Sequence, residues 1–223
     1  MIEVDRIHKS FGPVRAVQGI SFAVEPGKVT GLLGPNGAGK TTTIRMIAGF
    51  LAPDRGKVTI QGHDTIDQPL AARRLIGYLP ETVPMYPEMR AREYLTYRCR
   101  LFGLGRPDRK KAVGWALERC RVADVADRRI GTLSKGYRQR VGLASVLVHN
   151  PPVLILDEPT NGLDPTQIGE ARSLVTDLAR DRTLLISSHI LPEIERLCGR
   201  VIIVAGGVVK ANGPVDGGGT GWG

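Results

Sequence analysis

Short apolar runs along this chain alternate with segments in which apolar residues recur at helical spacing. Within residues 1–80 the short runs are separated by turn residues and predict strands, and a helical pattern follows the third of them. The predicted strands are residues 2–7, 20–24, 28–33, 57–61 and 75–79, and the predicted helix is residues 41–51. The chain therefore begins rich in β-structure and continues as alternating strand and helix.

From residue 81 onward the pattern becomes mostly helical. Prolines within residues 80–87 mark a loop, and apolar residues at helical spacing follow in residues 92–102. Asp108 is typical of the N-cap of a further helix, and residues 138–149 carry another helical pattern. We expect a helical subdomain over residues 81–140, inserted into a core formed by residues 1–80 and 141–212.

The last third of the chain returns to strands and helices in alternation. Residues 153–156 form a short apolar run suited to a buried parallel strand, and Pro165 is typical of the first position of a helix. Alternating strands and helices build a mostly parallel sheet with helices on both faces, so the predicted fold class is α/β. Further strands are predicted at residues 183–186 and 201–204, with a helix at residues 189–198 between them.

Length and composition fit one α/β domain with an inserted subdomain. The 223 residues are 42% hydrophobic, which suffices for a full core. We find no run of 18 or more apolar residues and no signal-peptide start, and therefore expect a cytosolic chain. Cys99, Cys120 and Cys198 lack metal-binding spacing and are typical of reduced core thiols. Glycines crowd residues 213–223, which we expect to form a disordered tail.

The net charge of +9, from 31 Lys and Arg against 22 Asp and Glu, leaves several partners open. It suits nucleic acid, an anionic membrane surface or polyphosphate. The basic residues are dispersed and the aromatic content is 5%, so a solvated basic face is an equal alternative. We expect no nucleic-acid partner.

The most specific motif lies between the strand at residues 28–33 and the helix at residues 41–51. It fits the phosphate-binding pattern G-x-x-x-x-G-K-[ST] at every fixed position. Glycines let the backbone aim several N–H groups at one anion, and the helix start adds its positive dipole. The expected nucleotide-binding residues here are Gly34, Pro35, Asn36, Gly37, Ala38, Gly39, Lys40, Thr41 and Thr42.

Two side chains of this loop have distinct expected roles. Lys40 would reach the β- and γ-phosphates of a nucleoside triphosphate, and Thr41 would offer its hydroxyl to Mg²⁺. A glycine-rich turn before an ordinary helix is the structural alternative. A dinucleotide-binding fold is excluded, because Thr42 stands where that fold needs its third glycine.

A pair of acids follows the apolar run at residues 153–156. Asp157 and Glu158 come just past the end of a buried strand, where ligands bind on an open α/β sheet. Asp157 would anchor Mg²⁺, directly or through water, and Glu158 would act as general base toward the attacking water. The structural alternative is a strand that ends in two solvated acids.

The segment Leu133-Ser134-Lys135-Gly136-Tyr137-Arg138-Gln139 resembles the signature loop of the ATP-binding subunits of ABC transporters. Ser134 begins the predicted helix at residues 138–149 and precedes Asp157 by 23 residues, as in that family. An ordinary serine cap is the alternative for Ser134. The resemblance covers residues 1–212 and implies a P-loop NTPase with a RecA-like core, an N-terminal antiparallel β subdomain and the helical insert. It adds Ser134 and Gly136 to the nucleotide-binding residues.

Further residues match this family individually. Phe11 resembles the aromatic residue that stacks on adenine, although Phe at such a position is otherwise a core residue. Residues 161–164 resemble the D-loop at the family's dimer interface. His189 resembles the switch histidine that contacts the γ-phosphate, with a helix cap as the alternative. Glu81 stands where most members carry glutamine, and the resemblance implies a contact with Mg²⁺ or the attacking water.

The resemblance implies an ATPase that uses ATP and Mg²⁺ and drives a bacterial exporter. Two copies would trap two ATP molecules head to tail, on the cytoplasmic face of the membrane and bound to a separate permease. The loop at residues 81–87 carries Val83, Met85 and Tyr86, which either pack on the helical insert or line a groove for the permease. The alternative function is a soluble ABC-type ATPase acting on ribosomes or DNA, and a non-enzymatic nucleotide sensor is a third.

Overall fold

An antiparallel sheet opens the chain. The computed structural model describes residues 1–215. A hairpin pairs β1 (Ile2–Phe11) with β2 (Val14–Val24), and β4 (Arg55–Ile60) and β5 (His63–Asp64) extend it to the order β2-β1-β4-β5. Phe11 therefore ends a strand at the tip of a hairpin rather than lying inside the sheet.

The second sheet is mostly parallel and has the order β10-β9-β3-β8-β7-β6. Its strands are β3 (Val29–Leu33), β6 (Ile76–Leu79), β7 (Val153–Asp157), β8 (Thr183–Ser188), β9 (Arg200–Ala205) and β10 (Val208–Pro214). β3, β8 and β7 are direct neighbours and run parallel. The segments that follow these three strands therefore emerge at the same edge of the sheet.

Both faces of this sheet are covered, because alternate residues of each strand enter different cores. Val153 and Ile155 of β7 pack into a core that includes α1 (Lys40–Ile47) and the antiparallel sheet. Leu154 and Leu156 pack into a second core formed with the later helices. The buried run at residues 153–156 thus contributes to both cores at once.

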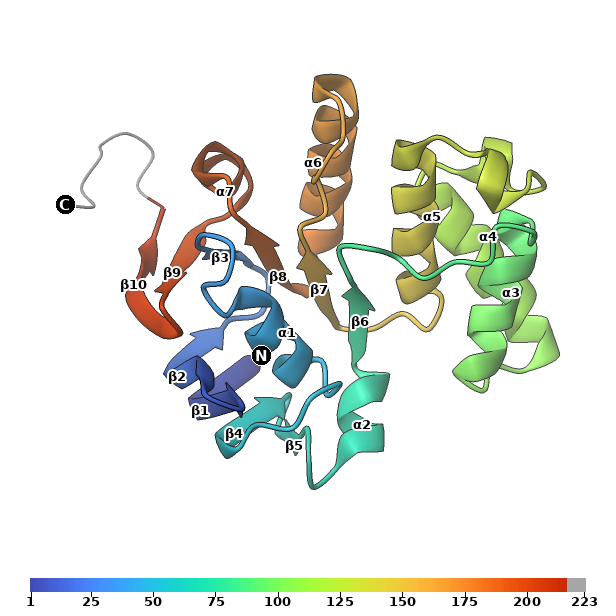
Figure 1. Cartoon of the computed structure of the whole chain (residues 1–223). Helices are drawn as coiled ribbons and strands as arrows, with labels where there is room; N and C mark the ends of the chain where they lie inside the picture. The colour runs from blue at the N-terminus through green and yellow to red at the C-terminus, as the bar shows by residue number, and fades with distance from the viewer. Residues whose placement is uncertain (216–223) are drawn as a thin grey trace.

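The helices between β6 and β7 form a separate group that lies at the far side of the parallel sheet from β1 and β2 (Figure 1). They are α3 (Ala91–Leu101), α4 (Arg106–Arg119), the short 3₁₀ helices η1 (Ala123–Val125) and η2 (Ile130–Thr132), and α5 (Lys135–Leu147). The remaining helices are α2 (Pro69–Arg74), α6 (Pro165–Ala179) and α7 (Leu191–Leu197). The predicted class, an α/β fold with an antiparallel β subdomain and a helical insert, is confirmed.

Several helix starts differ from the predictions. α4 begins at Arg106 after the N-cap Gly105, so Asp108 lies in the first turn instead of capping the helix. A carboxylate there still complements the helix dipole, which is why the residue is typical of both positions. α5 begins three residues earlier than its apolar pattern, and Ser134 is its N-cap, accepting a hydrogen bond from the Tyr137 N–H at 3.3 Å.

The predictions were also wrong at the end of the chain. Gly213 and Pro214 belong to β10, an edge strand paired with β9, instead of starting a disordered tail. Gly206 and Gly207 form the connecting turn with positive φ. Residues 216–223 lie outside the described part of the chain. The short β5 and α2 were missed because neither is long enough to show a periodic pattern of apolar residues.

The three cysteines are buried free thiols, as expected. Burial raises the pKa of the Cys198 thiol to about 12, so it stays protonated at neutral pH. Within residues 1–215, no helix combines the length and the apolar character needed to cross a membrane.

Candidate nucleotide site

The phosphate loop connects β3 to α1, and its glycines occupy positions that no other residue fits. A Cβ on Gly34 would lie 2.2 Å from the Val204 carbonyl oxygen, and one on Gly39 would lie 2.5 Å from that of Ala16. Gly39 is also the N-cap of α1, with φ of 99°. No acidic residue occupies the first turn of α1. Its positive N-terminus is therefore left to an external anion.

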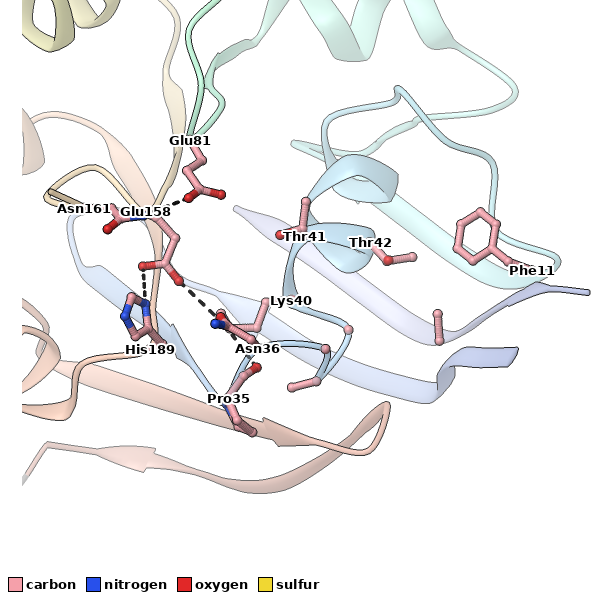
Figure 2. Close-up of a pocket in the computed structure, with 14 residues that line it drawn as sticks. Phe11, Pro35, Asn36, Lys40, Thr41, Thr42, Glu81, Glu158, Asn161 and His189 are labelled. Atoms are coloured by element: carbon pink, nitrogen blue, oxygen red, sulfur yellow. Dashed lines mark hydrogen bonds and ion pairs between the residues drawn. The ribbon is translucent and has the colours of Figure 1, made fainter. Parts of the chain in front are cut away.

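Lys40 turns back over the loop that precedes it. Its Nζ donates to the carbonyl oxygens of Gly34 at 2.8 Å and Pro35 at 3.3 Å. The same nitrogen lies 3.6 Å from Oε1 of Glu158, across the pocket. The other oxygen of Glu158 lies 2.9 Å from Nδ1 of His189. Glu158 thus lies between the ammonium group of Lys40 and the imidazole of His189, as Figure 2 shows.

The backbone at Glu158 is strained. Its φ is 49°, in the left-handed region that costs a non-glycine residue on the order of 1 to 3 kcal/mol. The Glu158 N–H donates to Oγ of Ser187 at 2.9 Å, and the Glu158 carbonyl accepts from the Asn161 N–H at 3.1 Å. These bonds hold the turn after β7 in place. The strain aims the carboxylate at Lys40 and His189 instead of along the strand.

Asp157 precedes Glu158 at the end of β7, is almost fully buried and does not line the pocket that contains Glu158. Burial raises the pKa of its carboxyl; a hydrogen bond from Ser187 opposes this, while the nearby Glu158 and Glu81 carboxylates raise it further. The positive charge of Lys40 lowers the pKa of Asp157, and a divalent cation beside this carboxylate would act in the same direction. The local charge thus fits a cation.

The donor set of the site fits Mg²⁺ in particular. Thr41, Glu81 and Asp157 offer only oxygen atoms, which this ion prefers. Within residues 1–215, no group of three or more His, Cys, Asp or Glu side chains would hold a metal alone. Mg²⁺ usually takes part of its coordination shell from water and nucleotide phosphates.

One pocket of about 500 Å³ brings most predicted site residues together. Phe11 lies at one end, beyond Thr42, and Glu158 and His189 lie at the other (Figure 2). Phe11 is 50% exposed and belongs to neither core, so the core alternative does not describe it. The pocket lining comprises Phe11, Ala16, Pro35, Asn36, Gly37, Ala38, Gly39, Lys40, Thr41, Thr42, Glu81, Glu158, Asn161 and His189.

Glu81 and Asn161 link this pocket to the helical subdomain. The Asn161 side-chain amide donates to Oε1 of Glu81 at 2.8 Å. Both residues also line a second groove of about 550 Å³, together with Val83, Met85 and Lys135. The Glu81–Asn161 pair thus lines both the nucleotide pocket and the groove.

Ser134 and Gly136 do not line the nucleotide pocket. Ser134 caps α5, and a Cβ on Gly136 would lie 2.8 Å from the side chain of Gln167 on α6. His189 is not a helix cap, because Ile190 is the N-cap of α7. The imidazole of His189 instead contacts Glu158.

Sequence reasoning missed several residues that support the site. Ser187 donates a hydrogen bond to Asp157 and accepts one from the Glu158 N–H, so it orients both acids. Glu193 of α7 is buried and accepts hydrogen bonds from Thr160 at 2.7 Å and Ser188 at 3.2 Å. These contacts join positions 33 and 5 residues apart. The adjacency of β7 and β8 brings Thr160 close to Glu193, and no local sequence pattern encodes this long-range contact.

Comparison with known proteins agrees with this geometry. The ABC transporter family model matches residues 17–161. The chain therefore belongs to the ABC transporter family, and within this family it is an ATP-binding subunit. It is 42% identical to the ABC transporter ATP-binding protein NatA of Bacillus subtilis, over 91% of this chain and 83% of NatA. It is also 42% identical to the Nod factor export ATP-binding protein I of Paraburkholderia xenovorans, over 95% and 70% of the two chains.

Solved structures show the same fold. An ATP-binding subunit of an ABC transporter matches with a TM-score of 0.86 and 32% identity, over 97% of this chain and 90% of the other. A nucleotide-free ATP-binding cassette from an ABC transporter matches with a TM-score of 0.85 and 27% identity, over 96% and 91%. The P-loop NTPase fold predicted from the motifs is therefore confirmed.

Proposed function

We propose that this chain binds and hydrolyses ATP with Mg²⁺ and that hydrolysis drives export through a separate membrane permease. The observation that carries the proposal is the contact of Lys40 and His189 with the same carboxylate, Glu158, inside the pocket that begins at the phosphate loop. The pocket thus contains both a cation that can bind phosphates, Lys40, and a carboxylate that can accept a proton from water, Glu158.

Each residue of the pocket has a role in this proposal. Lys40 and the N-terminus of α1 bind the phosphates, and Phe11 stacks on the adenine. Glu158 takes the proton of the attacking water, and His189 contacts the γ-phosphate from the other side. Thr41, Asp157 and Glu81 hold Mg²⁺, which supplies positive charge that offsets the charge of the phosphates.

Hydrolysis is tested with the purified chain and radiolabelled ATP. We expect release of phosphate that stops when EDTA removes Mg²⁺ and resumes when Mg²⁺ is restored. A turnover that is unchanged by EDTA would contradict the assigned role of the ion. ADP binding is measured in parallel. If ADP binds but no phosphate is released, the nucleotide site is correct and the proposed hydrolysis is wrong.

We further propose that two copies complete each other's nucleotide site. Ser134 and Gly136 lie outside the pocket of their own chain, so they reach a nucleotide only from a second copy. Ser134 is the N-cap of α5, a 13-residue helix with no acid in its first turn. That helix start suits an anion. A head-to-tail dimer places it opposite the phosphate loop of the partner.

Mixing two inactive variants tests this arrangement. Lys40→Ala removes the phosphate cation, and Ser134→Arg blocks the start of α5. In a mixed dimer, the intact Lys40 of one copy faces the intact Ser134 of the other, so one of its two sites is whole. We expect an equimolar mixture to recover about a quarter of wild-type turnover, since half of randomly formed dimers are mixed. No recovery would mean that each chain completes its own site.

The export direction and the place of action rest on the relatives and on the groove. Several relatives are named Nod factor export proteins, at 39% to 42% identity. The groove lined by Val83, Met85 and Lys135 shares the hydrogen-bonded residues Glu81 and Asn161 with the nucleotide pocket. A permease segment held there would sense the nucleotide through this pair. The chain would then act at the cytoplasmic face of the membrane.

A further inference from the structure

A second charged depression lies on the helical subdomain, between α3 and α4. Its volume is about 500 Å³, and it shares no residue with the nucleotide pocket or with the groove beside Glu81. Five of its seven lining residues are cationic: Arg92, Arg100, Arg106, Arg109 and Lys110, with Thr96 and Val113 between them.

The cations of this depression lack acidic partners. Arg92 forms an ion pair with Asp127 at 3.0 Å. Among residues 1–215, the other four cations take part in no ion pair and donate no side-chain hydrogen bond. Four positive charges therefore line one hollow without a direct ion pair among the described residues.

Two further features show that folding alone does not explain this arrangement. The Nε of Arg109 is buried and has no hydrogen-bond partner among the described residues, although buried polar atoms are normally paired. Arg106 also lies in the first turn of α4, where the helix dipole favours an acid such as Asp108 over a cation. An anion in the depression would offset both costs.

We propose that this depression binds phosphate-bearing anions. The guanidinium groups of Arg100, Arg106 and Arg109 present the donor fork that matches phosphate oxygens, and Lys110 adds a compact charge. No aromatic side chain lines the depression, so it offers nothing on which a nucleotide base would stack. The ligand is thus recognised by its phosphate alone, as the headgroup of an anionic phospholipid or as soluble polyphosphate.

Two triple variants with equal net charge test the site. Arg100→Gln, Arg106→Gln and Lys110→Gln neutralise three exposed cations of the depression. Arg74→Gln, Arg196→Gln and Lys210→Gln neutralise three exposed cations elsewhere. The full chain, saturated with ADP to fill the nucleotide pocket, is mixed with vesicles of phosphatidylcholine with or without phosphatidylglycerol, and separately with inorganic tripolyphosphate. Melting temperatures check that both variants fold.

We expect wild type and the control triple to bind one of the two anionic probes, and the depression triple to bind it on the order of 100-fold more weakly at low salt. Binding to phosphatidylglycerol vesicles identifies a lipid headgroup as the ligand, and binding to tripolyphosphate alone identifies a soluble one. Arg100→Lys with Arg106→Lys, which keeps the charge but loses two donor forks, should bind more weakly than wild type and more strongly than the depression triple. Equal loss in both triples, or no binding of either probe by wild type, would overturn the proposal.

Discussion

The ammonium group of Lys40 lies 3.6 Å from the carboxylate of Glu158, and both side chains are at least 90% shielded from solvent. In the nucleotide-free protein each charge is thus partly balanced by the other. We propose that an ATP phosphate bound to Lys40 would draw this side chain away from Glu158. Nucleotide binding would then free the carboxylate for its proposed role as a base.

Lys40→Ala should have two separable effects. It removes the cation proposed to bind the phosphates, and it takes from the buried Glu158 carboxylate its ion pair with Lys40, while the contact with His189 remains. We expect loss of measurable ATP affinity and a fall in stability of up to about 3 kcal/mol. Adding Glu158→Gln should restore stability but not affinity, as calorimetry and urea denaturation would show. Unchanged nucleotide affinity in Lys40→Ala would contradict the assignment of the loop.

Phe11→Ala should weaken the binding of ATP and GTP by a similar factor. A ring that stacks on a base does not distinguish purines, and its loss costs about 1 to 3 kcal/mol. Because Phe11 is half exposed, the melting temperature of the nucleotide-free protein should barely change. Phe11→Tyr is the matched control and should bind normally. A lowered melting temperature with normal affinity would assign Phe11 a structural role only.

Motifs with fixed spacing predicted the parts of the site that lie on one stretch of chain. The phosphate loop and the acids after β7 were found because their function depends on local backbone geometry, such as the glycine at 34 and the left-handed turn at Glu158. Ser187 and Glu193 were missed because their contacts depend on which strands are neighbours. Sequence periodicity indicates which face of a strand is buried, but it does not indicate which strands lie next to it.

In the fold, too, local features were predicted and features that depend on tertiary contacts were missed. Long apolar runs and helical patterns predicted most strands and helices, and the errors fall at ends and short elements. The end of β10 was missed because Gly213 indicated the start of a disordered tail, whereas pairing with β9 stabilises it. Pairing along an edge is a tertiary effect that outweighs the low strand propensity of glycine.

Met85→Asp combined with Tyr86→Ala should abolish permease binding and leave basal ATP turnover almost intact. Met85 lines the groove beside Glu81, and Tyr86 is exposed while its ring contacts Tyr94 and Tyr97. Neither residue lines the nucleotide pocket. Copurification with the permease measures the first effect and phosphate release the second. Normal assembly and transport by the double variant would place the docking site elsewhere.

His149 should make stability depend on pH between about 4 and 6.5. Its ring stacks on Phe102 with centroids 3.6 Å apart, and its Nε2 lies 3.0 Å from the Ile76 carbonyl oxygen. Burial lowers its pKa to about 4; the Ile76 hydrogen bond opposes this, and the charge of Arg98 adds to it. The unfolded chain therefore binds a proton in this range that the folded chain does not. Stability is full above the unfolded pKa and falls as the pH drops toward 4.

The shift corresponds to at most about 3 kcal/mol. His149→Gln keeps a donor for Ile76 and removes the titration. Urea denaturation at pH 7 and at pH 4.5 should show a smaller decrease for the variant than for wild type. Equal decreases would mean that His149 does not titrate differently on folding.

The most direct test of the account is the rate of ATP hydrolysis by Glu158→Gln, measured at a nucleotide concentration that saturates its binding. The amide keeps the shape of the side chain and cannot accept a proton from water. We predict that ATP still binds and that turnover falls on the order of 10² to 10⁴-fold, whereas Glu195→Gln, on the exposed side of α7, hydrolyses ATP normally. Hydrolysis by saturated Glu158→Gln at the wild-type rate would contradict the proposal that Glu158 is the base.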